Sequence, residues 1–206
     1  MKKAGLIFLA LAALAGCVEP ADVAVKRSFD FAKIKRVAVL DFAGTSGNVA
    51  ADNMVQSLLA AGADVVERRQ IGALINEGKL GAQGILDPAT AKEMGKLLGV
   101  DALFTGSVTT FSPERSYLVF TNSHQTTELG SSSAVDRGQV GGSPGTDVIT
   151  SDANVGLSAR MVETETGSIL WSAHLTYEGI DADSAMGQIC SSFVRSLEPI
   201  WLKKIN

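Results

Sequence analysis

The sequence predicts an α/β (α+β) fold, in which helices flank a mixed β-sheet. Between residues 36 and 111, short apolar runs alternate with segments whose apolar positions recur at helical spacing. Between residues 155 and 177, apolar and polar residues alternate along two segments joined by a short polar turn. The length of 206 residues fits a single domain of this class with short appendages.

The N-terminal residues have the pattern of a secretory signal peptide. Lys2 and Lys3 precede an unbroken apolar run over residues 4–16. A mature membrane-spanning helix needs ~20 apolar residues, whereas the apolar part of a signal peptide has ~7–15. We therefore predict that residues 1–16 are a lipoprotein signal peptide and that the mature chain begins at Cys17.

The end of this run, residues 14–17 (LAGC), resembles the lipobox of bacterial lipoproteins. The resemblance implies cleavage before Cys17 and lipidation of its thiol and new amino group, with palmitate among the acyl chains. Val18 stands where inner-membrane lipoproteins commonly have Asp, which implies an anchor in the outer membrane and a domain facing the periplasm. The alternative is an ordinary cysteine behind an ordinary signal peptide. Residues 17–35 show little periodicity, so we expect a lipidated N-terminus and tether there.

The first half of the domain alternates predicted strands with predicted helices. Short apolar runs predict strands at residues 36–42, 64–67 and 101–111. Helices are predicted from about residue 50 to a stop at Gly62 and over residues 68–80. Another helix is predicted from Asp87-Pro88 to Gly99, because Asp is a favoured N-cap residue and Pro fits the first turn. This β-α-β-α-α-β order is typical of a sheet with parallel neighbours.

The second half of the chain has a different character. Residues 116–126 have the composition of a strand, and residues 130–145 are rich in Gly and Ser, as loops are. We predict a polar, Gly/Ser-rich insertion over residues 116–154, built as a long β-hairpin or a loop. The alternating residues 155–161 and 169–177 predict an antiparallel hairpin with one buried face, and a final helix is predicted over residues 184–202. The domain is expected to span residues 36–202.

Composition and charge exclude several classes of protein. The formal net charge of −4 gives no basic footprint for nucleic acid, and 46% hydrophobic residues are too many for a disordered chain. Two Cys and two His provide neither a disulfide framework nor ligands at metal spacing. His124 lies in the polar insertion, and His174 is expected on the solvent face of the hairpin. We therefore predict no metal, no cofactor and no nucleic-acid partner.

Candidate catalytic groups have simpler structural interpretations. The turn at residues 44–47 (GTSG) offers amides to a phosphate, but it lacks the spacing of a dinucleotide or P-loop motif, so an ordinary β-to-α turn is favoured. Glu67 and Arg68 could act as a catalytic acid and an anion-binding residue. We favour the alternative, in which they are a charge at a helix terminus and a surface ion pair. The sequence thus predicts no catalytic residue and no enzyme activity. Core positions are expected for Cys190, Trp171 and Tyr177.

With these elements placed, the order of several short motifs resembles the CsgG family, named for the outer-membrane lipoprotein that secretes curli subunits. The resemblance covers roughly residues 35–173 and includes the lipobox. The matching landmarks follow the predicted strands and the hairpin turn: Asp41-Phe42; Glu67-Arg68 with Leu74 and Glu77; Gly99-Val100-Asp101 with Gly106-Ser107; and Thr166-Gly167 with Ile169-Leu170.

The resemblance implies a CsgG/TolB-N-like periplasmic domain that assembles as a ring. In that family two β-hairpin insertions per subunit unite into one membrane barrel that exports unfolded polypeptide. This sequence departs from the pattern, because residues 116–126 and 148–154 are too polar for membrane strands, which alternate apolar residues over ~9–11 positions. The second insertion, expected after Trp171, is missing. We therefore expect no complete barrel-forming set of insertions.

Two functions follow from the resemblance. The first is an outer-membrane-anchored lipoprotein, a homo-oligomer without enzyme activity, that serves export or assembly of a curli-like protein or an exopolysaccharide with export-system or cell-envelope partners. In the related Pel-polysaccharide export lipoproteins, a similar domain forms a ring beneath a separate outer-membrane channel. The alternative is a regulator that binds a periplasmic cell-wall synthase, as the LpoB lipoproteins do, although their long Pro-rich tether is absent from residues 18–35.

Overall fold

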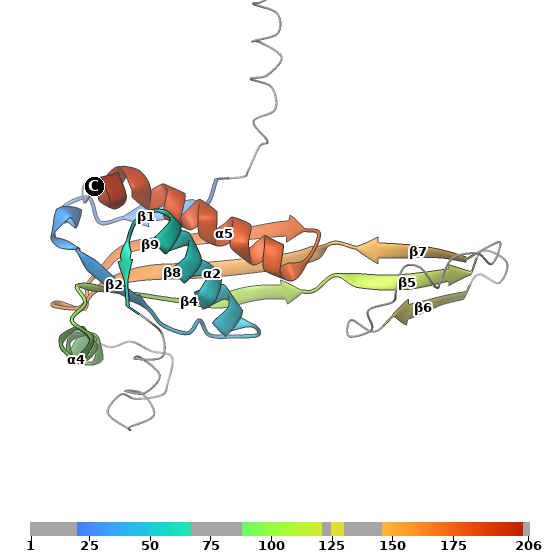
Figure 1. The fold of residues 1–206 in the computed structure, drawn as a ribbon, viewed down its shortest axis with the longest axis horizontal. Coiled ribbons are helices and arrows are strands. Elements are labelled where there is room, and N and C mark those ends of the chain that lie inside the picture. Colours follow the sequence, from blue (N-terminus) through green and yellow to red (C-terminus); the bar gives the residue numbers. More distant parts are fainter. Residues whose placement is uncertain (1–19, 67–87, 121–124, 130–145, 204–206) are drawn as a thin grey trace, which may run out of the picture.

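The computed structural model describes residues 20–66, 88–120, 125–129 and 146–203 (Figure 1). Their main sheet is mixed, and its spatial order is β1 (Asp22–Val25), β9 (Ile169–Gly179), β8 (Ala153–Glu163), β4 (Ala102–Ser112), β2 (Arg36–Val39) and β3 (Asp64–Val65). β2 is parallel to both β3 and β4, whereas the pairs β4–β8, β8–β9 and β1–β9 are antiparallel. The predicted α/β class with a mixed sheet and flanking helices is confirmed.

The parallel half of the sheet begins with a β-α-β unit. α2 (Gly47–Ala60) connects β2 to β3 and buries one face at helical spacing, which includes Ala50, Met54 and Leu58. Gly62 follows with φ 85°, a left-handed conformation that glycine adopts without strain, and it turns the chain towards β3. The helix starts three residues before the expected position 50, and β3 is shorter than the expected strand at residues 64–67.

The antiparallel half contains the hairpin that the alternation predicts. β8 and β9 each have 11 residues. Leu157 and Met161 of β8 are fully buried on the same face as Trp171, which pairs with Met161 in register. Gly167 in the connecting turn has φ 71°, again a conformation that favours glycine.

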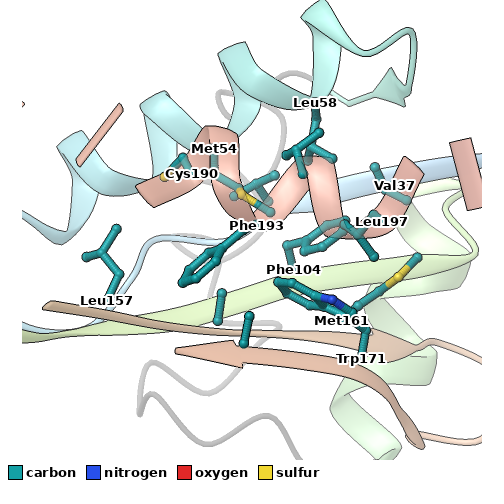
Figure 2. Close-up of a cluster of buried hydrophobic side chains, with 14 of the residues drawn as sticks. Val37, Met54, Leu58, Phe104, Leu157, Met161, Trp171, Cys190, Phe193 and Leu197 are labelled. Atoms are coloured by element: carbon teal, nitrogen blue, oxygen red, sulfur yellow. The ribbon is translucent and has the colours of Figure 1, made fainter. Parts of the chain in front are cut away.

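Helices cover both faces of the sheet (Figure 1). α2, α5 (Ala182–Leu197) and the π-helical turn η3 (Glu198–Leu202) pack on one face, while α4 (Pro88–Leu98) packs on the other against Leu103 and Val162. Figure 2 shows Met54 and Leu58 of α2 and Phe193 of α5 pointing towards Phe104 and Trp171 of the sheet. Among the helices that the structure describes, none is long and apolar enough to span a membrane.

The N-terminal segment differs from the expected tether at residues 17–35. Within it β1 pairs with β9, with Val25 opposite Trp171, and the 3₁₀ turn η2 (Phe31–Lys33) precedes β2. Phe31 and Ile34 are 3% and 2% exposed in the main core. Single buried residues in a short irregular segment carry no periodicity, so the sequence pattern missed their role. The folded domain therefore begins by Asp22 rather than at residue 36.

Candidate functional site

The region of the predicted insertion forms a projection at one end of the main sheet (Figure 1). Beyond β4 and β8, the chain forms a separate three-stranded sheet of β6 (Gln125–Leu129), β5 (Arg115–Phe120) and β7 (Thr146–Ser151), in that order. β5 is antiparallel to both of its neighbours. The expected strand at residues 116–126 is thus interrupted and becomes parts of β5 and β6, and the expected loop at residues 130–145 lies outside the described residues.

Polar contacts fasten β5 to β7 at the base of the projection. The N–H of Arg115 donates to Ser151 Oγ at 3.2 Å, and Ser151 Oγ donates to the carbonyl of Arg115 at 3.3 Å. The hydroxyls of Ser116 and Thr150 lie 3.2 Å apart. Ile149 pairs with Tyr117 in register, and 55% of Ile149 is exposed. Among residues 113–117 and 149–152, the part of the projection whose side chains the structure describes, none belongs to either buried core.

A pocket of about 320 Å³ lies where the projection joins the domain. Its walls come from the start of α2, the end of β4 and the start of α5, and its residues are Ser46, Val49, Phe111, Pro113, Glu114, Asp181, Ala182, Asp183 and Met186. The lining contains apolar side chains and three carboxylates. Among the described residues, the lining includes no Lys, Arg, His or Cys side chain.

Each carboxylate of the pocket has a structural partner. Glu114 Oε2 accepts from the N–H of Ala182 at 3.2 Å, which ties the base of the projection to α5. Asp181 caps α5 by accepting from the N–H of Ser184 at 2.8 Å, and this hydrogen bond, followed by that of the Ser184 hydroxyl, lowers the pKa of Asp181. Asp183 Oδ1 accepts from Asn53 Nδ2 at 3.0 Å and links α5 to α2. The carboxylates therefore position elements around the projection.

The turn at residues 44–47 starts beside the sheet, to which the preceding residue is hydrogen-bonded. Ala43 donates its N–H to the carbonyl of Gly106 at 2.9 Å and accepts from the N–H of Val108 at 2.8 Å. A Cβ on Gly44 would lie 2.9 Å from the Val108 carbonyl oxygen, and one on Gly47 would lie 1.8 Å from that of Phe42. These glycines permit a close approach of backbones, as the interpretation of an ordinary β-to-α turn requires.

Replacing Gly47 with Ala is expected to destabilise the domain by about 3 kcal/mol, because the backbone itself blocks the added methyl group. The matched control is Gly99→Ala, where the φ of 63° is strained for alanine but nothing lies within 4 Å of the added Cβ. That variant is expected to lose only about 1 kcal/mol. Urea unfolding followed by circular dichroism measures both; equal losses would show that the contact with Phe42 does not limit residue 47.

The remaining candidate groups do not assemble into a reactive site. Cys190 is fully buried, its thiol donates to the carbonyl of Ala50 at 3.6 Å, and burial raises its pKa to about 12, so it stays a neutral thiol. His174 is exposed on β9 as expected, opposite Asp22 and Ser158 in register. Within the described residues there is no group of three or more His, Cys, Asp or Glu side chains that suits a metal ion.

Several predicted residues lie outside the described part of the chain, namely Cys17, Glu67, Arg68 and His124. Trp171 is fully buried and Tyr177 packs against the same core, as expected. Sequence reasoning missed the carboxylates of the pocket. The pattern of Asp181 three residues before Ser184 signals a helix N-cap, but only the fold brings Glu114 and Asn53 to the same place.

Comparison with solved structures identifies distant likenesses. PelC from Paraburkholderia phytofirmans, a dodecamer in two crystal forms, aligns with 88% of this chain in both, at 19% and 16% identity. The TM-scores are 0.47 and 0.46, and 99% and 98% of the PelC chains are covered. Lipoprotein GNA1162 from Neisseria meningitidis aligns with 80% of this chain and 98% of its own, at 15% identity and a TM-score of 0.43.

A comparison with curated proteins finds no match. The family model described as "Curli production assembly/transport component CsgG" matches residues 23–187. This match begins inside β1, spans the whole projection and ends within α5, so it covers most of the chain and its described fold. The chain therefore belongs to the CsgG family.

Proposed function

We propose that this chain is an outer-membrane lipoprotein, anchored through Cys17 and facing the periplasm, that oligomerises and serves the export or assembly of a surface polymer. Membership of the CsgG family over residues 23–187 is the observation that carries the proposal. The polymer is a curli-like protein or an exopolysaccharide. The chain acts by binding and assembly, without catalysis.

The shape of the molecule supports a role in assembly. The projection extends from one end of the sheet (Figure 1), and Ile149 on it is 55% exposed. At its base, Glu114 and Asp183 hold α5 and α2 around the start of the projection. A folded domain with an exposed strand surface is suited to contact a second subunit, a channel protein or the cargo.

Removing the projection is expected to abolish export while leaving the domain folded. In this variant Asn-Gly replaces residues 115–151 and joins Glu114 to Asp152, because a two-residue turn suits the neighbouring antiparallel strands β4 and β8. The melting temperature is expected to change by no more than roughly 5 °C, since the described core is intact. Surface polymer on cells that carry only the variant is expected to fall to the level of cells without the gene.

The same cells separate this proposal from the alternative. Wild-type polymer levels on cells that carry the shortened but folded chain would contradict a role of the projection in export. Size analysis of the detergent-extracted full chain is expected to show an oligomer. A strictly monomeric particle that co-purifies with a cell-wall synthase would instead support a regulatory lipoprotein and overturn the proposed assembly.

A further inference from the structure

Positive charge is concentrated in one short segment of the chain. Residues 22–36 contain five basic residues, Lys26, Arg27, Lys33, Lys35 and Arg36, against two acidic ones, Asp22 and Asp30. Residues 37–206 contain 11 basic and 19 acidic residues, so the formal charge is +3 in the first segment and −8 in the second. Positive and negative charge are therefore unevenly distributed along the chain, and such an uneven distribution gives a protein a directed electrostatic field.

The fold spreads this segment across one end of the main sheet. β1 and β2 are separated in the sheet by β9, β8 and β4, so their connection at residues 26–35 crosses the ends of these strands (Figure 1). The N–H of Lys26 donates to the carbonyl of Leu170 at 2.8 Å, and buried Phe31 and Ile34 hold the connection in place. Trp201 Nε1 donates to the carbonyl of Ile34 at 3.0 Å, which brings the C-terminal turn η3 to the same end.

These contacts create what we call the basic surface, formed by exposed side chains at that end of the sheet: Lys26, Arg27, Lys33, Lys35 and Lys203. Arg36 is left out because it lies 3.5 Å from Asp64 in an ion pair. The five side chains of the basic surface form no ion pair with any residue that the structure describes. Nearby carboxylates accept from backbone instead: Asp30 from the N–H of Ala32, and Asp101 from those of Lys35 and Arg36.

Exposed apolar side chains border the basic surface. Ile169, at the start of β9, is 49% exposed. It directly precedes Leu170, whose carbonyl accepts the hydrogen bond from the N–H of Lys26. Val23 on β1 is 39% exposed. Cations beside exposed aliphatic side chains at an edge of the domain match the chemistry of a lipid interface, where headgroups take the cations and the acyl boundary takes the apolar groups.

We propose that the basic surface binds the headgroups of anionic phospholipids in the membrane that holds Cys17, and so orients the domain on that membrane. The inference rests on the proposed lipid anchor. Residues 18–21 alone separate Cys17 from β1, so at ~3.3–3.6 Å per residue Asp22 stays within about 18 Å of the anchor. β1 then leads directly to Lys26. The membrane is therefore the anionic surface that the chain itself keeps beside these cations, and the acidic remainder of the domain is repelled from it.

The proposal is tested on the full lipidated chain reconstituted in vesicles, after mass analysis of Cys17. A fluorophore is placed on Ser28→Cys, an exposed position between Arg27 and Phe29, since buried Cys190 does not compete for the label. A lipid-bound quencher in the headgroup region reports proximity. Quenching is expected to be about threefold greater in vesicles of phosphatidylcholine with phosphatidylglycerol than in phosphatidylcholine alone, and to fall at 0.5 M salt, where screening is ~4 Å. A label on Thr110→Cys, near the other end of β4, is expected to change little.

Charge reversal supplies matched variants. Lys33→Glu with Lys35→Glu is expected to remove the lipid-dependent difference, whereas Lys92→Glu with Lys96→Glu, which changes the net charge equally on α4, is expected to keep it. Equal quenching in neutral and anionic vesicles, or equal effects of the two variant pairs, overturns the proposal. A response of the Ser28 label to soluble alginate but not to anionic vesicles assigns the surface to an acidic polymer and also overturns it.

Failure of the lipid anchor is recognised separately. If mass analysis finds no acyl chain on Cys17, the proposed anchor is wrong, and the same full chain is then sedimented with the two kinds of vesicle. Sedimentation that requires anionic lipid, and that is lost in the Lys33→Glu, Lys35→Glu variant, would still support lipid binding by the basic surface. Its absence overturns the lipid-binding proposal as well.

Discussion

Replacing Cys17 with Ser is expected to remove this protein from the outer-membrane fraction almost completely. A serine hydroxyl does not replace the thiol that takes the diacylglycerol in lipobox sequences, so neither cleavage nor acylation follows. Each buried CH₂ of an acyl chain contributes about 0.8 kcal/mol, and several chains together give an attachment far firmer than the marginal binding of one. Density-gradient fractionation, with labelled palmitate and mass analysis of the N-terminus, measures the loss.

Cys190 provides the matched control for this variant. It is the other cysteine of the chain, and it is fully buried with its thiol hydrogen-bonded to the carbonyl of Ala50. Cys190→Ala therefore removes a thiol and leaves the lipobox residues unchanged. Palmitate incorporation and the outer-membrane location are expected to persist in it. A second arm replaces Val18 with Asp, which is expected to leave acylation intact and retain the lipoprotein at the inner membrane. Palmitate on the Cys17→Ser protein would contradict the assignment of Cys17.

Replacing Trp171 with Ala is expected to cost about 3–5 kcal/mol of unfolding free energy, a large part of the roughly 5–15 kcal/mol that stabilises a typical domain. The indole is fully buried and packs edge-on against Phe104 and Phe193, with ring centroids 6.1 and 5.8 Å away. Nε1 of Trp171 donates to Ser196 Oγ at 3.1 Å. Truncation therefore leaves a cavity between the sheet and α5 and removes a hydrogen bond. Thermal unfolding is expected to show a melting temperature lower by roughly 10 °C.

A conservative variant separates the cavity from the hydrogen bond. Trp171→Phe keeps an aromatic ring between Phe104 and α5 but loses the donor to Ser196, and it is expected to cost about 1–2 kcal/mol. Leu59→Ala, at a position on α2 that is 54% exposed, is expected to change stability by no more than about 1 kcal/mol. If Trp171→Ala were as stable as Leu59→Ala, Trp171 would not be the centre of the core that Figure 2 shows.

Predictions from periodicity were confirmed where an element has a long, one-sided apolar pattern. β8 and β9 alternate over 11 residues each, and α5 repeats buried residues at helical spacing from Ala185 to Leu197. The start of α5 was placed two residues late, because Asp181 acts as the N-cap through its bond to the N–H of Ser184. Such differences concern the ends of elements, where local capping rather than the apolar pattern decides.

Predictions failed where a residue is buried by distant partners. The segment before β2 has neither a helical nor a strand period, yet β9 pairs with β1 and the core takes up Phe31 and Ile34. The strand expected at residues 116–126 is divided between β5 and β6, which pair with each other from Ser116 opposite Leu129 to Phe120 opposite Gln125. Pairing of this kind depends on which chain segments meet, and local composition does not contain that information.

The sequence by itself determined the α/β class, the hairpin and the resemblance to the CsgG family, because each depends on a local pattern or an ordered set of motifs. It also predicts a lipid anchor at Cys17, which stays a prediction. Only the tertiary structure decided that residues 22–34 belong to the domain, that Glu114 lies beside the start of α5, and that Lys33 and Lys203 lie at the same end of the sheet. Burial, hydrogen bonding and charge clustering act between atoms that are close in space, and the chain brings these residues together only when the sheet and its helices have formed.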